Sequence, residues 1–212
     1  MNKLIVLVLA CTLLFSCTEE KKANVIGLQT LNFFPDFYVD SISSAIERLY
    51  GFKTIALKNK IIPNNFFSTT KSARYRADSI VDLLNREMPE DIYQIIGLTC
   101  VDISITKKDK NGKTEAPVSF YENWAVFGLA NDGKPGSVVS TFRVQGPNQK
   151  LVIERMQKIS LHELGHNIGL THCDNMSCCM HPKVESFKDV DSIALNLCIR
   201  CKTTAHQLSP KN

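Results

Sequence analysis

The chain has 212 residues, of which 44% are hydrophobic and 22% are charged, and its formal net charge is +4. This balance fits one globular domain and excludes a disordered segment or a long coiled coil. The basic residues are scattered, without a stripe of Lys and Arg between aromatic residues, so we expect no nucleic-acid partner.

The N-terminus has the pattern of a bacterial export signal. A short basic start precedes an apolar run from Leu4 to Phe15, which is too short to cross a membrane and suits the core of a signal peptide. The run ends at Ser16-Cys17, a small residue directly before cysteine, which resembles a bacterial lipobox. We predict a signal peptide over residues 1–16, acylation of Cys17 and a polar tether over residues 17–24.

This prediction makes the protein an exported lipoprotein, held on a membrane through its N-terminal lipid anchor. The alternatives are an ordinary signal peptide in which Cys17 is incidental, or an uncleaved membrane anchor. Residues 25–212 would then form a single domain, which we expect to be a monomer.

Strand and helix patterns alternate in the first half of this domain. In chain order they predict a strand over Val25–Leu31, a helix over Asp36–Tyr50 ended by Gly51, a strand over Phe52–Leu57, a helix over Ser72–Met88 ended by Pro89, and strand material over Ile92–Ile105 with a break near Gly97.

The second half begins with a charged turn at Lys107–Lys113, which contains an Asn-Gly pair. Two β-like segments follow, Trp124–Ala130 and Ser137–Val144, and Pro147 then introduces a long helix that reaches Ile168. The order of the elements predicts an α/β (α+β) fold with a mixed sheet and one long helix.

The long helix ends in an H-E-x-x-H-x-x-G-x-x-H motif, from His162 to His172. Residues four apart share a helix face, so His162 and His166 can bind one ion, and Glu163 beside them can contact a metal-bound water. Gly169 can adopt the left-handed conformation that ends a helix, which lets His172 return as a third ligand. Three histidines and an open fourth position are typical of catalytic zinc.

A set of cysteines follows the motif. Cys173 and Cys178 form a C-x4-C pair and Cys198 and Cys201 a C-x2-C pair, which favours a structural zinc site. Because an exported protein meets an oxidising compartment, two short disulfides, Cys173–Cys178 and Cys198–Cys201, are the alternative.

Taken together, the motif, the four cysteines and Met180 resemble the archaemetzincin family of zinc metallopeptidases. The resemblance implies a metzincin-like fold with a small C-terminal subdomain around the cysteine zinc, two zinc ions per chain, and Met180 as the Met-turn residue below the catalytic metal. It also implies that an edge strand, either Trp124–Ala130 or Ser137–Val144, pairs with an extended peptide. Pro182 stands where some metzincins carry a tyrosine ligand, and the lipobox departs from a family that looks intracellular.

The predicted function is hydrolysis of a peptide or protein substrate, with Glu163 as general base. The alternative is a catalytically weak or inactive zinc-binding lipoprotein that holds a peptide or protein partner. We expect no zymogen, because no candidate latency cysteine precedes the motif. No role follows from the sequence for Cys100, Cys179 or His206, and His181 is expected to border the site.

Overall fold

The structure is a computed structural model that describes residues 24–131, 133–182 and 186–210. The predicted signal peptide, the lipidation site at Cys17 and nearly all of the tether lie outside these residues. Within the described part of the chain, no helix is long and apolar enough to span a membrane.

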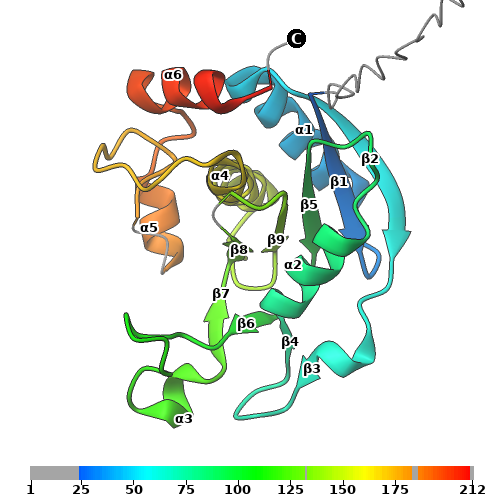
Figure 1. The fold of residues 1–212 in the computed structure, drawn as a ribbon, viewed down its shortest axis with the longest axis vertical. Helices are drawn as coiled ribbons and strands as arrows, with labels where there is room; N and C mark the ends of the chain where they lie inside the picture. The colour runs from blue at the N-terminus through cyan, green and yellow to red at the C-terminus, as the bar shows by residue number, and fades with distance from the viewer. Residues whose placement is uncertain (1–23, 132, 183–185, 211–212) are drawn as a thin grey trace, which may run out of the picture.

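A five-stranded sheet with the order β2-β1-β5-β9-β8 forms the body of the molecule (Figure 1). Its strands are β1 (Val25–Leu31), β2 (Lys53–Lys60), β5 (Gln94–Thr99), β8 (Gly128–Ala130) and β9 (Gly136–Ser140). Neighbouring strands run parallel except β8, which pairs antiparallel with β9 at one edge of the sheet. As an edge strand, β8 has a free side for one more strand within this sheet.

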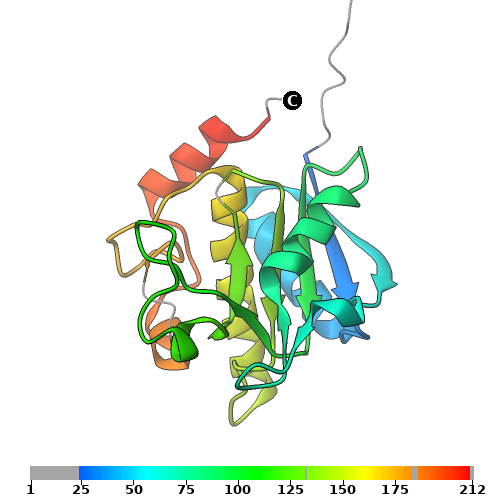
Figure 2. The ribbon, with the colours of Figure 1, turned by 60° about the horizontal axis from the view of Figure 1, so that its bottom comes forward.

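Helices cover both faces of this sheet (Figure 2). They are α1 (Asp36–Tyr50), α2 (Ala77–Arg86) and α4 (Gln149–Ile168). Because successive residues of a strand point to opposite faces, Ile96 and Val139 pack in one cluster with α1 and α4, while Ile95 and Val138 pack in another with α2. The long helix α4 therefore packs beside α1 on one face of the sheet, over β5, β9 and β8, and α2 covers the other face.

A smaller four-stranded sheet with the order β3-β4-β6-β7 lies below the first in Figure 1. Its strands are β3 (Phe67–Ser68), β4 (Arg74–Arg76), β6 (Ile103–Ile105) and β7 (Trp124–Val126), with the short helices η1 (Asn64–Phe66) and α3 (Val118–Tyr121) beside it. Only Phe127 separates β7 from β8, so one stretch of chain supplies an edge of both sheets. The edge position of Trp124–Ala130 is thus confirmed, β9 is an inner strand, and the pairing with a peptide stays a prediction.

Two helices complete the C-terminal part, α5 (Phe187–Ser192) and α6 (Ile199–Leu208). The Arg155 guanidinium on α4 forms an ion pair with Asp191 on α5, at 2.6 Å. Arg155 also donates to the carbonyl of Val144, so this buried cation is held from two sides.

The mixed α/β fold and most predicted elements are confirmed, including α1 and its end at Gly51, where φ is +76°. The predicted helix over Ser72–Met88 is wrong at its start, because Arg74–Arg76 form strand β4 and the helix begins at Ala77. Tyr75 and Arg76 pair with β6, which is a contact between distant residues that helical periodicity does not contain.

The break in the strand material over Ile92–Ile105 is also displaced. It lies between β5 and β6, whereas Gly97 lies inside β5. A Cβ at Gly97 would come 2.7 Å from Leu84 Cδ1, so this glycine permits close packing of α2 rather than a bend. The strand predicted to reach Val144 ends at Ser140.

Candidate metal centre

The helix α4 carries the first two histidines of the motif. The Asn148 side chain caps its start by accepting a hydrogen bond from the Leu151 amide, at 3.0 Å. Gly169 ends it with φ of +103°, and the Leu170 amide donates back to the Gly165 carbonyl. This turn brings His172 back toward the helix, as predicted.

The three imidazoles gather at one point. The Nε2 atoms of His162 and His166 are 3.1 Å apart, and the candidate ligand atoms of these two rings and His172 all lie within 4.8 Å of one another. Two nitrogens bound to one tetrahedral zinc at about 2.0–2.1 Å would be about 3.3 Å apart. The spacing of the rings therefore fits a shared zinc ion.

Backbone carbonyls orient two of these rings. The His162 Nδ1 lies 2.7 Å from the Cys179 carbonyl oxygen, and the His166 Nδ1 lies 3.0 Å from that of Leu170. Because a carbonyl only accepts, each Nδ1 donates its proton, and Nε2 of the neutral ring keeps the lone pair that binds a metal. Two such lone pairs at close range need a cation between them.

His162 is also held in its neutral form. Burial, together with the neighbouring His166 and His172, lowers its pKa from 6.5 to about 3, although the hydrogen bond to Cys179 opposes this. A neutral imidazole is the form that coordinates zinc, so this site needs no proton release from His162 at neutral pH.

Glu163 lies between the histidines and the edge strand. Its side chain is buried, and a Cβ on Gly128 of β8 would come 2.7 Å from Glu163 Oε1. The absence of a side chain at position 128 therefore allows the carboxylate to approach the strand. Glu163 and Gly128 both line a cavity of about 400 Å³ that also includes the three histidines.

Met180 is fully buried below the helix. A Cβ on Gly165 would overlap the Met180 thioether and come 2.9 Å from the Tyr50 hydroxyl, so the helix and Met180 pack without space between them. This is the burial expected of a Met-turn residue, although a plain core methionine would show the same. His181 follows and is buried too.

The four predicted cysteines also come together, with their sulfur atoms within 4.8 Å of one another. The Sγ atoms of Cys173 and Cys198 are 3.7 Å apart, whereas a disulfide has about 2.05 Å and two thiolates on one tetrahedral zinc have about 3.8 Å. All four thiols are free, so the structure contains neither of the two alternative disulfides.

The electrostatics of this cluster favour a cation. Burial would raise the pKa of Cys173, but hydrogen bonds from the Asn175 backbone, Arg200 and the neighbouring thiols lower it to about 7. Burial and the other sulfurs instead raise the pKa of Cys201. Four thiolates therefore cannot coexist at neutral pH unless a metal ion offsets their charge.

The sequence did not predict several parts of the site. The roles of Gly128, of the Cys179 carbonyl and of Arg200, which donates to Cys173 Sγ at 3.2 Å, depend on contacts between distant residues. Only Gly128 carried a signal, since a glycine within a strand often marks a close approach. Cys100 is exposed, and the Cys179 thiol is buried.

The comparisons with known proteins agree with this geometry. The sequence profile of peptidase family M54 matches residues 38–207. The chain belongs to peptidase family M54. Among curated members, the archaemetzincin of Haloquadratum walsbyi is 32% identical over 170 residues, covering 75% of this chain and 86% of that protein. That of Methanopyrus kandleri is 30% identical over 163 residues, covering 77% and 83%.

Solved M54 structures share the fold. The archaemetzincin of Methanopyrus kandleri superimposes with a TM-score of 0.71 at 26% identity, covering 90% of this chain and 98% of that one. The Archaeoglobus fulgidus archaemetzincin, solved with malonate, gives 0.66 at 25% identity, covering 84% and 98%. This M54 protein is therefore a zinc metallopeptidase of the archaemetzincin family with the predicted fold.

Proposed function

We propose that this M54 peptidase hydrolyses peptide bonds at the three-histidine site, with Glu163 as general base. The observation that carries the proposal is the position of Glu163, which lines one cavity with His162, His166 and His172 beside an edge strand. When bound by these histidines, zinc supplies a Lewis acid that lowers the pKa of a water ligand to about 7 and polarises a carbonyl.

The chain's own groups perform the other steps. The free side of β8 can pair with an extended peptide, which orients the scissile bond along the cavity. The Glu163 carboxylate takes a proton from the attacking water and returns it to the leaving amine. The carbonyls of Cys179 and Leu170 hold His162 and His166 in the orientation that metal binding requires.

Glu163→Gln separates catalysis from metal binding. The amide cannot accept the proton, so peptide hydrolysis should fall by at least about 100-fold, while the zinc content stays that of the parent protein. Turnover of a peptide library by mass spectrometry and zinc content by atomic emission measure the two effects. Hydrolysis at the parental rate in the variant would refute the role of Glu163.

A metal-binding module that holds a peptide without cleaving it is the competing function. A library digest with the zinc-loaded protein, compared with a chelator-treated sample, distinguishes the two. Cleavage that disappears with the chelator supports the peptidase, whereas binding without products supports the module.

The four cysteines support a second, structural zinc ion. We infer that Cys173, Cys178, Cys198 and Cys201 hold it, because their thiols are free and their sulfurs gather at the spacing of a tetrahedral site.

The location of the protein is a separate proposal, which rests on the sequence alone. We infer that the chain is a monomer exported as a lipoprotein and held on the membrane at Cys17. Cys17→Ser should move the protein from the membrane fraction to the soluble fraction of the producing cell, as measured by fractionation and blotting. An unchanged distribution would contradict acylation at Cys17.

A further inference from the structure

A second, larger pocket adjoins the metal centre. It has a volume of about 870 Å³, extends along β7 and shares Gly128 and Glu163 with the cavity at the histidines. A peptide whose scissile bond lies at Glu163 must therefore place a neighbouring residue at this pocket. The residues that line it decide which side chain fits there.

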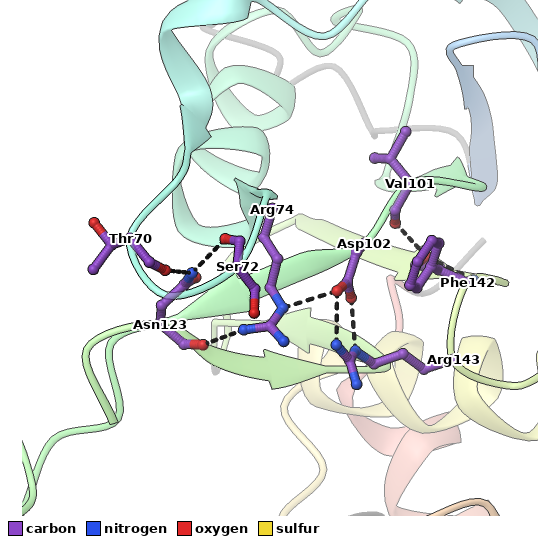
Figure 3. A network of polar contacts seen from close by, with 9 residues as sticks. Thr70, Ser72, Arg74, Val101, Asp102, Asn123, Phe142 and Arg143 are labelled. Carbon is purple, nitrogen blue, oxygen red and sulfur yellow. Dashed lines mark hydrogen bonds and ion pairs between the residues drawn. The ribbon is translucent and has the colours of Figure 1, made fainter. Parts of the chain in front are cut away.

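One wall contains two arginines held by a single carboxylate (Figure 3). Asp102 accepts from Arg143 Nε and Nη2, at 2.6 and 2.7 Å, and from Arg74 Nε, at 2.8 Å. Arg74 Nη1 also donates to the Asn123 carbonyl, at 2.7 Å. Each guanidinium has five N–H groups, so both arginines keep N–H groups without a partner among the described residues.

The cations of this pocket exceed its carboxylates. Four cationic side chains line it and Glu163 is the one acidic side chain among the described lining residues, while Asp102 offsets one of the two guanidinium charges. Lys71 adds an ammonium that lies 4.2 Å from the Phe120 ring centroid, and no carboxylate of the described residues lies within ion-pair distance of it. Lys107 also lines the pocket but has Glu115 at 3.9 Å, so it contributes less. The excess positive charge favours an anionic ligand.

The arginines are fixed before a ligand arrives. Asp102 is buried, and Asn123 Nδ2 donates to the carbonyls of Thr70 and Ser72, which ties the chain before Arg74 to β7. A guanidinium that one carboxylate already holds in place loses little conformational freedom when it binds a second carboxylate, that of a ligand.

Aromatic rings also line the pocket. Phe142 and Phe187 are about half exposed and line the pocket with Trp124, whose ring also lies 5.1 Å from Lys107 Nζ. Such rings can cover the apolar stem of a side chain whose charged end reaches the arginines.

We propose that this pocket is a specificity subsite for a carboxylate on the substrate, bound by Arg74, Arg143 and Lys71. The carboxylate belongs either to a glutamate or aspartate side chain next to the scissile bond or to the C-terminus of the peptide. This inference rests on the proposed peptidase function, since it assigns the pocket to the same substrate.

Peptide binding to zinc-loaded Glu163→Gln protein tests the subsite without turnover. Trp124 is the single tryptophan of the chain and lines the pocket, so its fluorescence reports occupancy. The probes are capped penta-alanine peptides with one Glu, Gln or Lys at each position in turn, and penta-alanine with a free or an amidated C-terminus. We expect at least one Glu peptide, or the free-acid peptide, to bind about tenfold more tightly than its neutral match.

Variants show which residues cause the preference. Lys71→Gln should reduce the preference for the carboxylate about threefold, and Arg143→Gln should reduce it further. Lys53→Gln, the same charge change on exposed β2 at the opposite edge of the sheet, should leave it unchanged. If Arg143→Gln fails to fold, the loss of the carboxylate preference in Lys71→Gln still tests the subsite. The zinc-free protein should keep the preference, which excludes direct binding of the carboxylate to the metal.

Equal affinity for Glu, Gln and Lys peptides and for both C-termini would overturn the inference, as would a preference that survives both pocket variants. Digestion of the same peptides by the parent protein separates the two proposals. Carboxylate-dependent binding without cleavage would overturn the peptidase function, while cleavage without any preference would overturn only the subsite.

Discussion

At the scale of single residues, the most informative contact is the one between Gly128 and Glu163. The two residues are 35 positions apart in sequence, yet no side chain other than hydrogen fits at position 128 without moving the carboxylate. A general base works only within hydrogen-bond reach of its proton, so Gly128 sets the position from which Glu163 would act in the proposed mechanism.

Gly128→Ala should therefore impair catalysis more than folding. The added Cβ meets the end of a flexible side chain, so the free energy of unfolding should fall by only about 1 kcal/mol. The displaced carboxylate should lower kcat by about 10- to 100-fold, because small errors in position are costly. Steady-state kinetics measure kcat, and the zinc content shows whether the variant still binds its metal.

Gly136→Ala is the matched control. Its Cβ would come 2.6 Å from Asn85 Oδ1, also the end of a flexible side chain, but Gly136 lines neither cavity. A kcat within about twofold of the parent is expected there. Equal losses in both variants would show that Gly128 acts through folding rather than through Glu163.

At the scale of elements, α4 is unusual because it is buried between the sheet and its helical neighbours while carrying polar groups. Arg155 pairs with Asp191, and Asn167 Nδ2 donates to the carbonyls of Lys134 and Gly136, while Asn167 Oδ1 has no partner among the described residues. His162 Nδ1 donates a hydrogen bond to the Cys179 carbonyl. Its other nitrogen must remain unprotonated, which links the stability of the helix to pH.

The zinc-free protein should lose stability on acidification. The pKa of His162 is about 3 when folded and 6.5 when unfolded, so between these values only the unfolded chain binds this proton. The free energy of unfolding therefore falls as pH decreases through this window, by up to about 1.4 kcal/mol per pH unit. Urea denaturation of the metal-free protein from about pH 7 to about pH 4 measures the slope.

His162→Gln should show a flatter dependence, whereas His206→Gln, an exposed change on α6, should keep the parental slope. The Arg155 hydrogen bond lowers the pKa of Asp191, so the stability from that pair is lost only at more acidic pH and does not enter this range. A parental slope in His162→Gln would contradict the assignment.

At the scale of the whole molecule, the cysteine cluster joins segments that the sheet does not connect. Cys173 follows His172 directly, and Cys198 and Cys201 lie at the start of α6. Beyond the other end of α6, the Pro210 carbonyl accepts a hydrogen bond from the Asn24 side chain, at 3.1 Å, just before strand β1. A metal in this cluster would hold His172 against the C-terminal helix.

Cys201→Ser should remove the structural zinc ion that we infer at this cluster, so the zinc content should fall from the proposed two ions per chain to one. Without that ion, amide exchange should increase over residues 173–182 and 186–208, while β1 and β5 stay protected, because they are buried in the sheet. Cys100→Ser changes an exposed cysteine outside the cluster and should retain both ions. One zinc per parental chain, with unchanged exchange in Cys201→Ser, would contradict a structural metal.

The sequence alone predicted the two sets of candidate ligands, which the structure brings together, and most of the elements around them. The spacing of His162 and His166 follows from the helical repeat, the end of the helix from Gly169, and the limits of α1 from apolar periodicity and Gly51. Each of these signals depends on residues that are close together in the chain, so it can be recognised from the sequence alone.

Tertiary structure decided what surrounds those ligands. The approach of Gly128 to Glu163, the strand at Arg74–Arg76 and the Asp102 carboxylate between two arginines each join residues that lie far apart in sequence. No local period encodes such contacts, because they form only when the sheets bring β4, β6 and β7 beside the end of α4. The sequence therefore determined the candidate ligands of the centre, and the packing of the sheets determined the pocket beside it, where we propose that the substrate is selected.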